Sequence, residues 1–100
     1  MKIQRKPPSK AFLKDVRKAV RILKEEGCTE VYLFGSAAEG EVRWGSDIDL
    51  AVRGCPHGRF FEVLGRLLGE LRRSVDLISL DRGDDFGQYL EKHGGLVRVD

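Results

Sequence analysis

Residues 31–52 read VYLFGSAAEGEVRWGSDIDLAV. An apolar segment runs into a Gly-Ser turn, and ten residues later a second apolar segment begins with two carboxylates one residue apart. Side chains alternate between the faces of a strand, so Asp47 and Asp49 point to one side while Ile48 and Leu50 point into the protein. Two carboxylates on one face repel each other and favour a hard, oxygen-preferring cation such as Mg²⁺ between them. The stretch therefore predicts two strands and a candidate metal site.

The periodicity of apolar residues places further elements around these strands. A link of about twenty residues that contains a helix follows the second strand, and that length suits a parallel crossover. The link between the first two strands is shorter and fits an antiparallel pair. The predicted fold class is α/β (α+β), with a small mixed β-sheet packed by helices. The expected elements are a helix over 10–26, strands over 30–34 and 47–53, a helix over 59–73, a strand over 74–80, a helix over 84–92 and a short strand over 96–99.

The length of 100 residues fits one domain. We expect a flexible arm over 1–8, because Pro7 and Pro8 disfavour helix there, and a single domain over 9–100. No apolar run approaches the length of a membrane helix, and the first residues lack the apolar core of a leader peptide. We therefore expect a cytoplasmic protein without a membrane partner.

Cys28 and Cys55 show no metal-binding or redox spacing and are expected to be free, reduced thiols.

Charge is distributed unevenly along the chain, although the net charge is only +2. Residues 1–24 hold nine Lys or Arg and one acid, whereas the other 76 residues hold nine Lys or Arg and fifteen acids. Six of the cations share one face of the first predicted helix, opposite its apolar face. This face is either a solvated surface or a contact for an acidic partner.

A third carboxylate, Asp76, lies on the predicted strand 74–80 among apolar neighbours. If that strand lies beside 47–53, Asp76 reaches the face that holds Asp47 and Asp49. Three carboxylates can hold two divalent metals, which together assist the in-line displacement of a phosphoryl or nucleotidyl group. Gly35 lets the backbone approach a phosphate, and the Ser36 amide and hydroxyl supply donors to it. Ser46 is a further candidate phosphate contact.

Gly-Ser, ten residues, Asp-x-Asp and then a strand with one Asp together resemble the minimal nucleotidyltransferases of the DNA polymerase beta superfamily. The resemblance spans about residues 10–99. It implies a polymerase-beta-type nucleotidyltransferase core, two Mg²⁺ ions, and ATP or another NTP as the donor of a nucleoside monophosphate to a hydroxyl. By the same resemblance, Gly35 and Ser36 hold the triphosphate, Asp47 and Asp49 bind both metals, and Asp76 completes the catalytic metal site.

Many single-domain members resemble the antitoxin half of a two-gene system. The resemblance then implies a HEPN-domain ribonuclease toxin as partner, neutralised by transfer of AMP to one of its tyrosines. The chain shows no second domain for a small acceptor, which also favours a partner protein or a homodimer.

One position departs from the family pattern. Relatives often carry a basic residue shortly after Gly-Ser, where this chain has Glu39; Arg43 is the candidate that compensates for it. Two alternatives therefore stay open: a catalytically weak antitoxin that neutralises its partner by binding, and a nucleic-acid-binding module that uses the basic helix. The second leaves the three aspartates unexplained, so nucleic acid is the less favoured partner.

Overall fold

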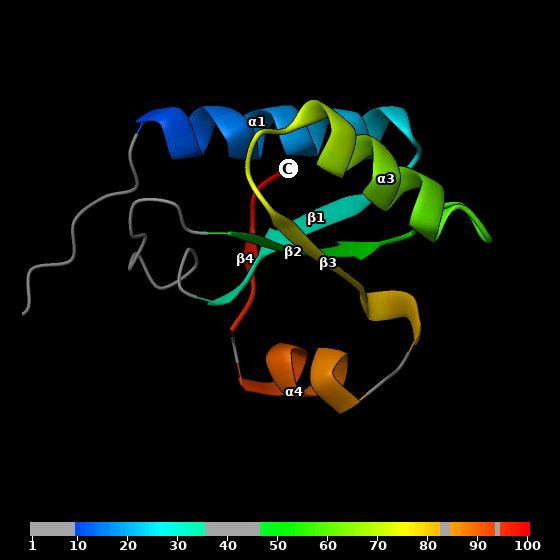
Figure 1. Cartoon of the computed structure of the whole chain (residues 1–100). Helices are drawn as coiled ribbons and strands as arrows, with labels where there is room; N and C mark the ends of the chain where they lie inside the picture. Colours follow the sequence, from blue (N-terminus) through cyan, green and yellow to red (C-terminus); the bar gives the residue numbers. More distant parts are fainter. Residues whose placement is uncertain (1–9, 36–46, 83–84, 94) are drawn as a thin grey trace, which may run out of the picture.

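The computed structural model describes residues 10–35, 47–82, 85–93 and 95–100. A four-stranded mixed sheet in the order β3-β2-β1-β4 forms its centre (Figure 1). Strand β1 is antiparallel to β2 and β4, whereas β2 and β3 are parallel. The predicted α/β class, the antiparallel first pair and the parallel crossover are confirmed. The elements are α1 (Lys10–Glu25), β1 (Glu30–Leu33), β2 (Ile48–Arg53), α3 (Phe60–Glu70), β3 (Val75–Ser79), the 3₁₀ turn η1 (Leu80–Arg82), α4 (Asp85–His93) and β4 (Val97–Arg98).

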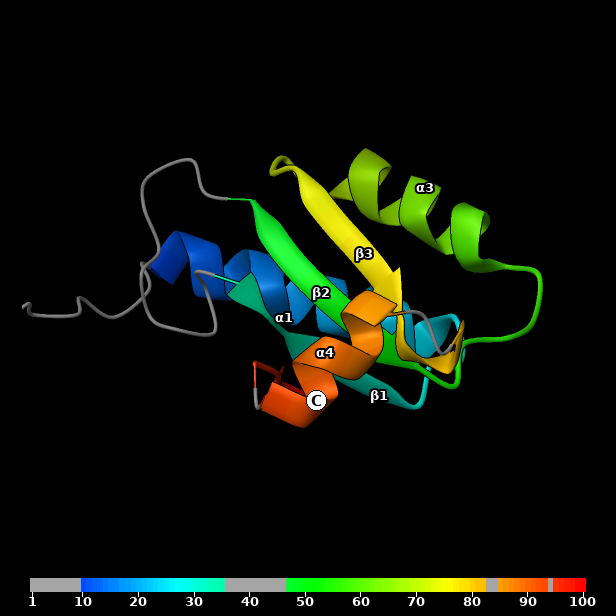
Figure 2. The ribbon, with the colours of Figure 1, turned by 90° about the horizontal axis from the view of Figure 1, so that it is seen from below.

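Helices cover both faces of the sheet. Figures 1 and 2 show α1 and α3 on one face and α4 on the other. On the first face Ile48, Leu50 and Val52 of β2 are fully buried in the larger core with residues of α1 and α3. On the second face a smaller core forms around Ala51, packed with Phe34, Leu80 and Leu90. The alternation of β2 thus separates the side packed by α1 and α3 from the side that carries Asp49 and is packed by α4.

Helix α1 ends at Glu25, one residue before the end expected from the sequence. Gly27 has a φ of 98°, a left-handed conformation that a glycine adopts without steric cost. The amide of Gly27 donates to the Lys24 carbonyl at 3.1 Å, and that of Cys28 donates to the Leu23 carbonyl at 3.0 Å. These two bonds form a Schellman motif, which satisfies the last carbonyls of the helix and turns the chain toward β1.

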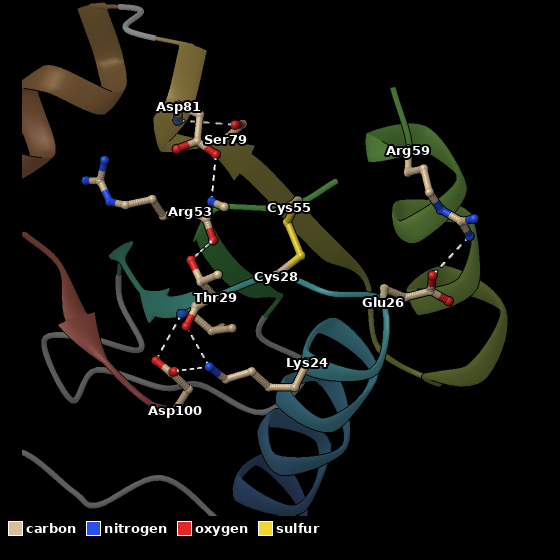
Figure 3. The surroundings of a disulfide bond; sticks show 12 residues. Lys24, Glu26, Cys28, Thr29, Arg53, Cys55, Arg59, Ser79, Asp81 and Asp100 are labelled. Carbon is tan, nitrogen blue, oxygen red and sulfur yellow. Dashed lines mark hydrogen bonds and ion pairs between the residues drawn. A yellow bond between two sulfur atoms is a disulfide. The ribbon is translucent and has the colours of Figure 1, made fainter. Parts of the chain in front are cut away.

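Cys28 and Cys55 form a disulfide bond, so the expectation of two free thiols is wrong (Figure 3). The two cysteines lie just beyond the last residue pair of the β1–β2 ladder, Glu30 opposite Arg53. The antiparallel register brings them together, although 27 positions separate them in sequence. Disulfides are uncommon in the cytosol of mesophiles but occur inside hyperthermophile cells. The cytoplasmic location therefore stays a prediction.

Breaking this disulfide should destabilise the fold. The cross-link closes a loop across 27 positions, and loop-closure entropy predicts a contribution of about 3.5 kcal/mol for a loop of that length. We expect the reduced chain to unfold at lower denaturant concentration than the oxidised chain, as measured by circular dichroism. A Cys28→Ala/Cys55→Ala variant serves as control, because its unfolding should not respond to reductant. Equal stability of the oxidised and reduced chains would contradict the cross-link.

Polar contacts surround the disulfide and tie neighbouring segments together (Figure 3). The Asp81 carboxylate accepts a hydrogen bond from the Gly54 amide at 2.7 Å, which links η1 to the loop after β2. The Asp100 carboxylate pairs with Lys24 at 2.5 Å and accepts from the Val31 amide at 3.0 Å. These contacts hold the far end of the sheet, away from the acidic residues at the start of β2.

The helical pattern of the sequence places Phe60, Phe61 and the leucines of α3 in the core, and this prediction is wrong at two positions. Val63 and Leu67 are buried, but Phe61 is 74% exposed and Leu68 is 51% exposed. Both exposed residues lie about one position away from the buried stripe. Because of the helical period, this offset places them on the outer face. Among the described residues, no helix has the length and apolarity needed to cross a bilayer.

Candidate active site

Two parallel strands bring the predicted acids to one face of the sheet. Asp49 on β2 lies directly opposite Asp76 on β3 in the register, and Asp47 precedes β2. Ile48 and Leu77 point into the larger core, so the alternation of both strands turns Asp49 and Asp76 toward the other face. Asp49 is half-buried, whereas Asp47 and Asp76 are exposed. The sequence predicts that Asp76 reaches this face if β3 lies beside β2, and β3 does lie beside β2.

The three carboxylates act on one another electrostatically. Burial raises the pKa of Asp49 above its usual 3.8, and the negative charges of Asp76 and Asp47 raise this pKa further. A covered carboxylate with two like charges beside it holds a proton or a cation more tightly than a solvated one. Carboxyl groups with such perturbed pKa values concentrate at functional sites, which makes Asp49 the centre of the candidate site.

Gly35 packs against this centre. Its φ is 70°, and a Cβ atom added to it would lie 2.5 Å from Oδ2 of Asp49. The amide of the preceding residue, Phe34, donates to the Asp49 carbonyl at 3.0 Å. Any side chain at position 35 would therefore be strained and would displace the carboxylate. The sequence predicts a glycine here for phosphate approach, but it does not reveal this contact with Asp49.

Aromatic packing between Phe34 and α4 supports the backbone next to Gly35. The rings of Phe34 and Phe86 meet edge to face with their centroids 5.7 Å apart. Phe34 also belongs to the buried cluster between the sheet and α4. This packing fixes the backbone that leads into Gly35. The helical pattern over 84–92 includes Phe86 but does not reveal this contact between two distant segments.

The other predicted site residues lie outside the described residues. They are Ser36, Arg43 and Ser46, and the same holds for Glu39 and for the proposed arm over 1–8. Their roles in binding the triphosphate stay predictions.

The chemistry of the acids fits a divalent metal. They offer carboxylate oxygens, which hard cations such as Mg²⁺ prefer, and a cation would relieve the repulsion that raises the pKa of Asp49. Within the described ranges, however, no three Asp, Glu, His or Cys side chains form a ready-made metal cluster. Two Mg²⁺ ions on Asp47, Asp49 and Asp76 therefore stay a prediction.

The raised pKa of Asp49 predicts that this carboxylate costs stability in metal-free buffer. Ionisation is harder in the folded state than in the unfolded state, so the penalty is complete above the folded pKa and disappears below the usual value of 3.8. Asp49→Asn should raise the free energy of unfolding at neutral pH by roughly 1 kcal/mol, a common size for stabilising changes. The gain should shrink as the pH falls toward about 4.

Urea unfolding at several pH values in metal-free buffer measures this effect. Asp85→Asn, an exposed acid in the first turn of α4, is the matched control and should give no comparable gain. A loss of stability in Asp49→Asn at neutral pH would show that favourable contacts, not repulsion, dominate around Asp49.

Comparisons with known proteins agree with this geometry. The profile of the family described as "Polymerase beta, Nucleotidyltransferase" matches residues 17–97. No curated protein gives a significant match. Among solved structures, a toxin–antitoxin structure with AMP-PNP is 25% identical, covering 82% of this chain and 69% of the other, with a TM-score of 0.64.

Two further solved structures share the fold. The MntA–HepT toxin–antitoxin structure is 22% identical, covering 86% of this chain and 69% of the other, with a TM-score of 0.61. A putative nucleotidyltransferase from Sulfolobus solfataricus is 21% identical, covering 91% of this chain and 86% of the other, with a TM-score of 0.50.

Proposed function

Because the chain belongs to the polymerase beta nucleotidyltransferase family, with the fold expected of it, we propose that it is a Mg²⁺-dependent nucleotidyltransferase that moves AMP from ATP to a hydroxyl. The observation that carries the proposal is the placement of Asp49 opposite Asp76 on parallel strands, with Gly35 packed against Asp49. The role we assign is that of an antitoxin, and the acceptor is a hydroxyl of a HEPN-domain toxin.

In the proposed reaction the acceptor oxygen bonds to the α-phosphorus of ATP. The bond from that phosphorus to the bridging oxygen breaks, and pyrophosphate leaves. Asp76 is exposed on the edge strand β3, where an incoming hydroxyl has access to it, and it accepts the hydroxyl proton directly or through water. When bound, Mg²⁺ neutralises charge on the phosphates and aligns the reacting oxygens. Asp47 and Asp49 are the residues that would hold the two ions, and Asp76 would complete the site of the catalytic one.

Fold similarity supports the choice of partner. Two of the three solved structures described above are toxin–antitoxin structures, one of them with the ATP analogue AMP-PNP. We carry this pairing to the present chain as part of the proposal. A homodimer is the other arrangement that would present a hydroxyl to Asp76.

The test combines the chain with the product of the neighbouring gene, ATP and Mg²⁺, and follows both the mass and the toxicity of that product. We expect a mass gain of one adenylyl group and a loss of toxicity. An Asp47→Asn/Asp49→Asn variant should give neither. Failure of the unchanged chain to modify its partner, under varied NTPs and metals, would overturn the enzymatic proposal.

Neutralisation by binding alone is a second candidate function. Two features favour it: Glu39 departs from the basic residue that the family pattern often has there, and the outer face of α3 exposes Phe61 and Leu68. Exposed aromatic and aliphatic side chains of this kind are common at protein interfaces. Equal neutralisation by the Asp47→Asn/Asp49→Asn variant, without any mass gain, would support this candidate.

A further inference from the structure

A groove rich in cations runs between α1 and the end of α3. It has a volume of about 920 Å³, and α1 and the segment that ends α3 line it. The Nζ of Lys18 donates to the Glu70 carbonyl at 3.0 Å, which joins the two walls. The lining cations are Lys14, Arg17, Lys18, Arg21 and Arg72. The sequence indicates a basic helix face but not that Arg72 completes it from the other side.

The acids in this groove are already paired. Asp15 accepts a hydrogen bond from Arg73 at 3.1 Å, and Glu70 accepts one from Arg66 at 2.5 Å. Within the described residues, by contrast, none of Lys14, Arg17, Arg21 and Arg72 forms an ion pair with a carboxylate. The groove therefore presents an excess of positive charge to solvent.

The spacing of the cations suits a repeating anion. Residues 14, 17, 18 and 21 share one helix face and span about 10 Å along the axis. Along the axis of a duplex, where each strand carries one phosphate per ~3.4 Å, that length covers roughly three phosphates of one strand. Arg72 adds a contact from the opposite wall.

The composition of the lining decides between two kinds of acidic partner. The cores of protein interfaces are apolar and depleted of Lys, with aromatic anchors at their centres. Nucleic-acid interfaces are more polar and much more positive. Among the described residues that line the groove, Ala11 is the one apolar residue and none is aromatic. We propose that the groove binds the phosphodiester backbone of a nucleic acid.

The groove is distinct from the nucleotidyl-transfer site, so the three aspartates no longer argue against nucleic-acid binding. Helix α1 covers the sheet face opposite the one that carries Asp49 and Asp76 (Figures 1 and 2). The aspartates and the groove are thus two separate sites, and each accounts for its own residues.

The test measures fluorescence anisotropy with labelled oligouridylate, oligothymidylate of the same length, and poly-L-glutamate. We expect binding to an oligonucleotide that weakens with salt, with a slope of log affinity on log salt of about −2 to −3.5 for three to five phosphate contacts on a single strand. Lys14→Ala/Arg17→Ala/Arg21→Ala should weaken binding by at least about tenfold and reduce the slope by about 2. The two oligonucleotides distinguish RNA from DNA as the natural source of the backbone.

Matched controls distinguish binding in the groove from non-specific attraction by positive charge elsewhere on the chain. Arg17→Ala and Lys92→Ala each remove one cation, but Lys92 lies on α4, and only Arg17→Ala should weaken binding. Asp47→Asn/Asp49→Asn should bind nucleic acid as well as the unchanged chain, so failure of the enzymatic proposal leaves this one standing. Three results would overturn the proposal: no salt-sensitive binding at low salt, unchanged binding by the triple variant, or equal or tighter binding of poly-L-glutamate, which would indicate an acidic protein.

Discussion

Asp49→Asn is expected to reduce nucleotidyl transfer by at least about a thousandfold while the chain stays folded, since a loss of that size corresponds to about 4 kcal/mol of transition-state stabilisation. Asn has the shape of Asp but lacks its charge, so it no longer offers a carboxylate to a divalent cation. Asp49 is the one acidic residue of β2, so no other carboxylate on that strand substitutes for it. Single-turnover transfer of labelled AMP to the partner measures the effect.

Two comparisons make this result specific. Asp85→Asn removes an acid on α4 and should leave the transfer rate close to that of the unchanged chain. The Asp49→Asn variant should also unfold at equal or higher urea concentration at neutral pH, which excludes misfolding as the cause of the loss. Retention of transfer within tenfold would show that Asp49 does not hold the metal.

Gly35→Ala is expected to reduce transfer by about a hundredfold, the cost of misplacing a catalytic group by about an ångström. The added Cβ would lie 2.5 Å from Oδ2 of Asp49, so the carboxylate or the turn must move. The positive φ adds about 1–2 kcal/mol of backbone strain. Transfer kinetics and urea unfolding should be measured on the same protein preparation.

Gly58→Ala separates the effect of backbone strain from the effect of the contact with Asp49. Gly58 has a φ of 81°, but a Cβ added there meets no atom within 4 Å. This control should lose a similar amount of stability from strain while keeping its transfer rate. If Gly35→Ala and Gly58→Ala give the same transfer rate, the contact between Gly35 and Asp49 has no catalytic importance.

The arrangement of the strands was predictable because it follows from local rules. Alternation along 47–53 placed Ile48 and Leu50 inside and Asp49 on the other face, and the length of the link after β2 indicated a parallel β3. These rules involve neighbouring residues and chain length, both visible in the sequence. The opposition of Asp49 and Asp76 followed once β3 was placed beside β2.

Features that depend on long-range register were not predictable in the same way. The pairing of Cys28 with Cys55 requires the offset of β1 against β2, which spacing motifs do not encode. The exposure of Phe61 depends on how α3 is rotated against α1, since its hydrophobicity alone suggests burial. The excess charge of the basic groove depends on Arg66 and Arg73 pairing with its acids.

The most direct measurement compares ATP labelled at the α-phosphate with ATP labelled at the γ-phosphate, each incubated with the chain, its partner and Mg²⁺. We predict that the α-label becomes covalently attached to the partner, that the γ-label appears in pyrophosphate, and that chelation of the metal stops both. Attachment of the γ-label to the partner, or attachment of neither label, would contradict nucleotidyl transfer.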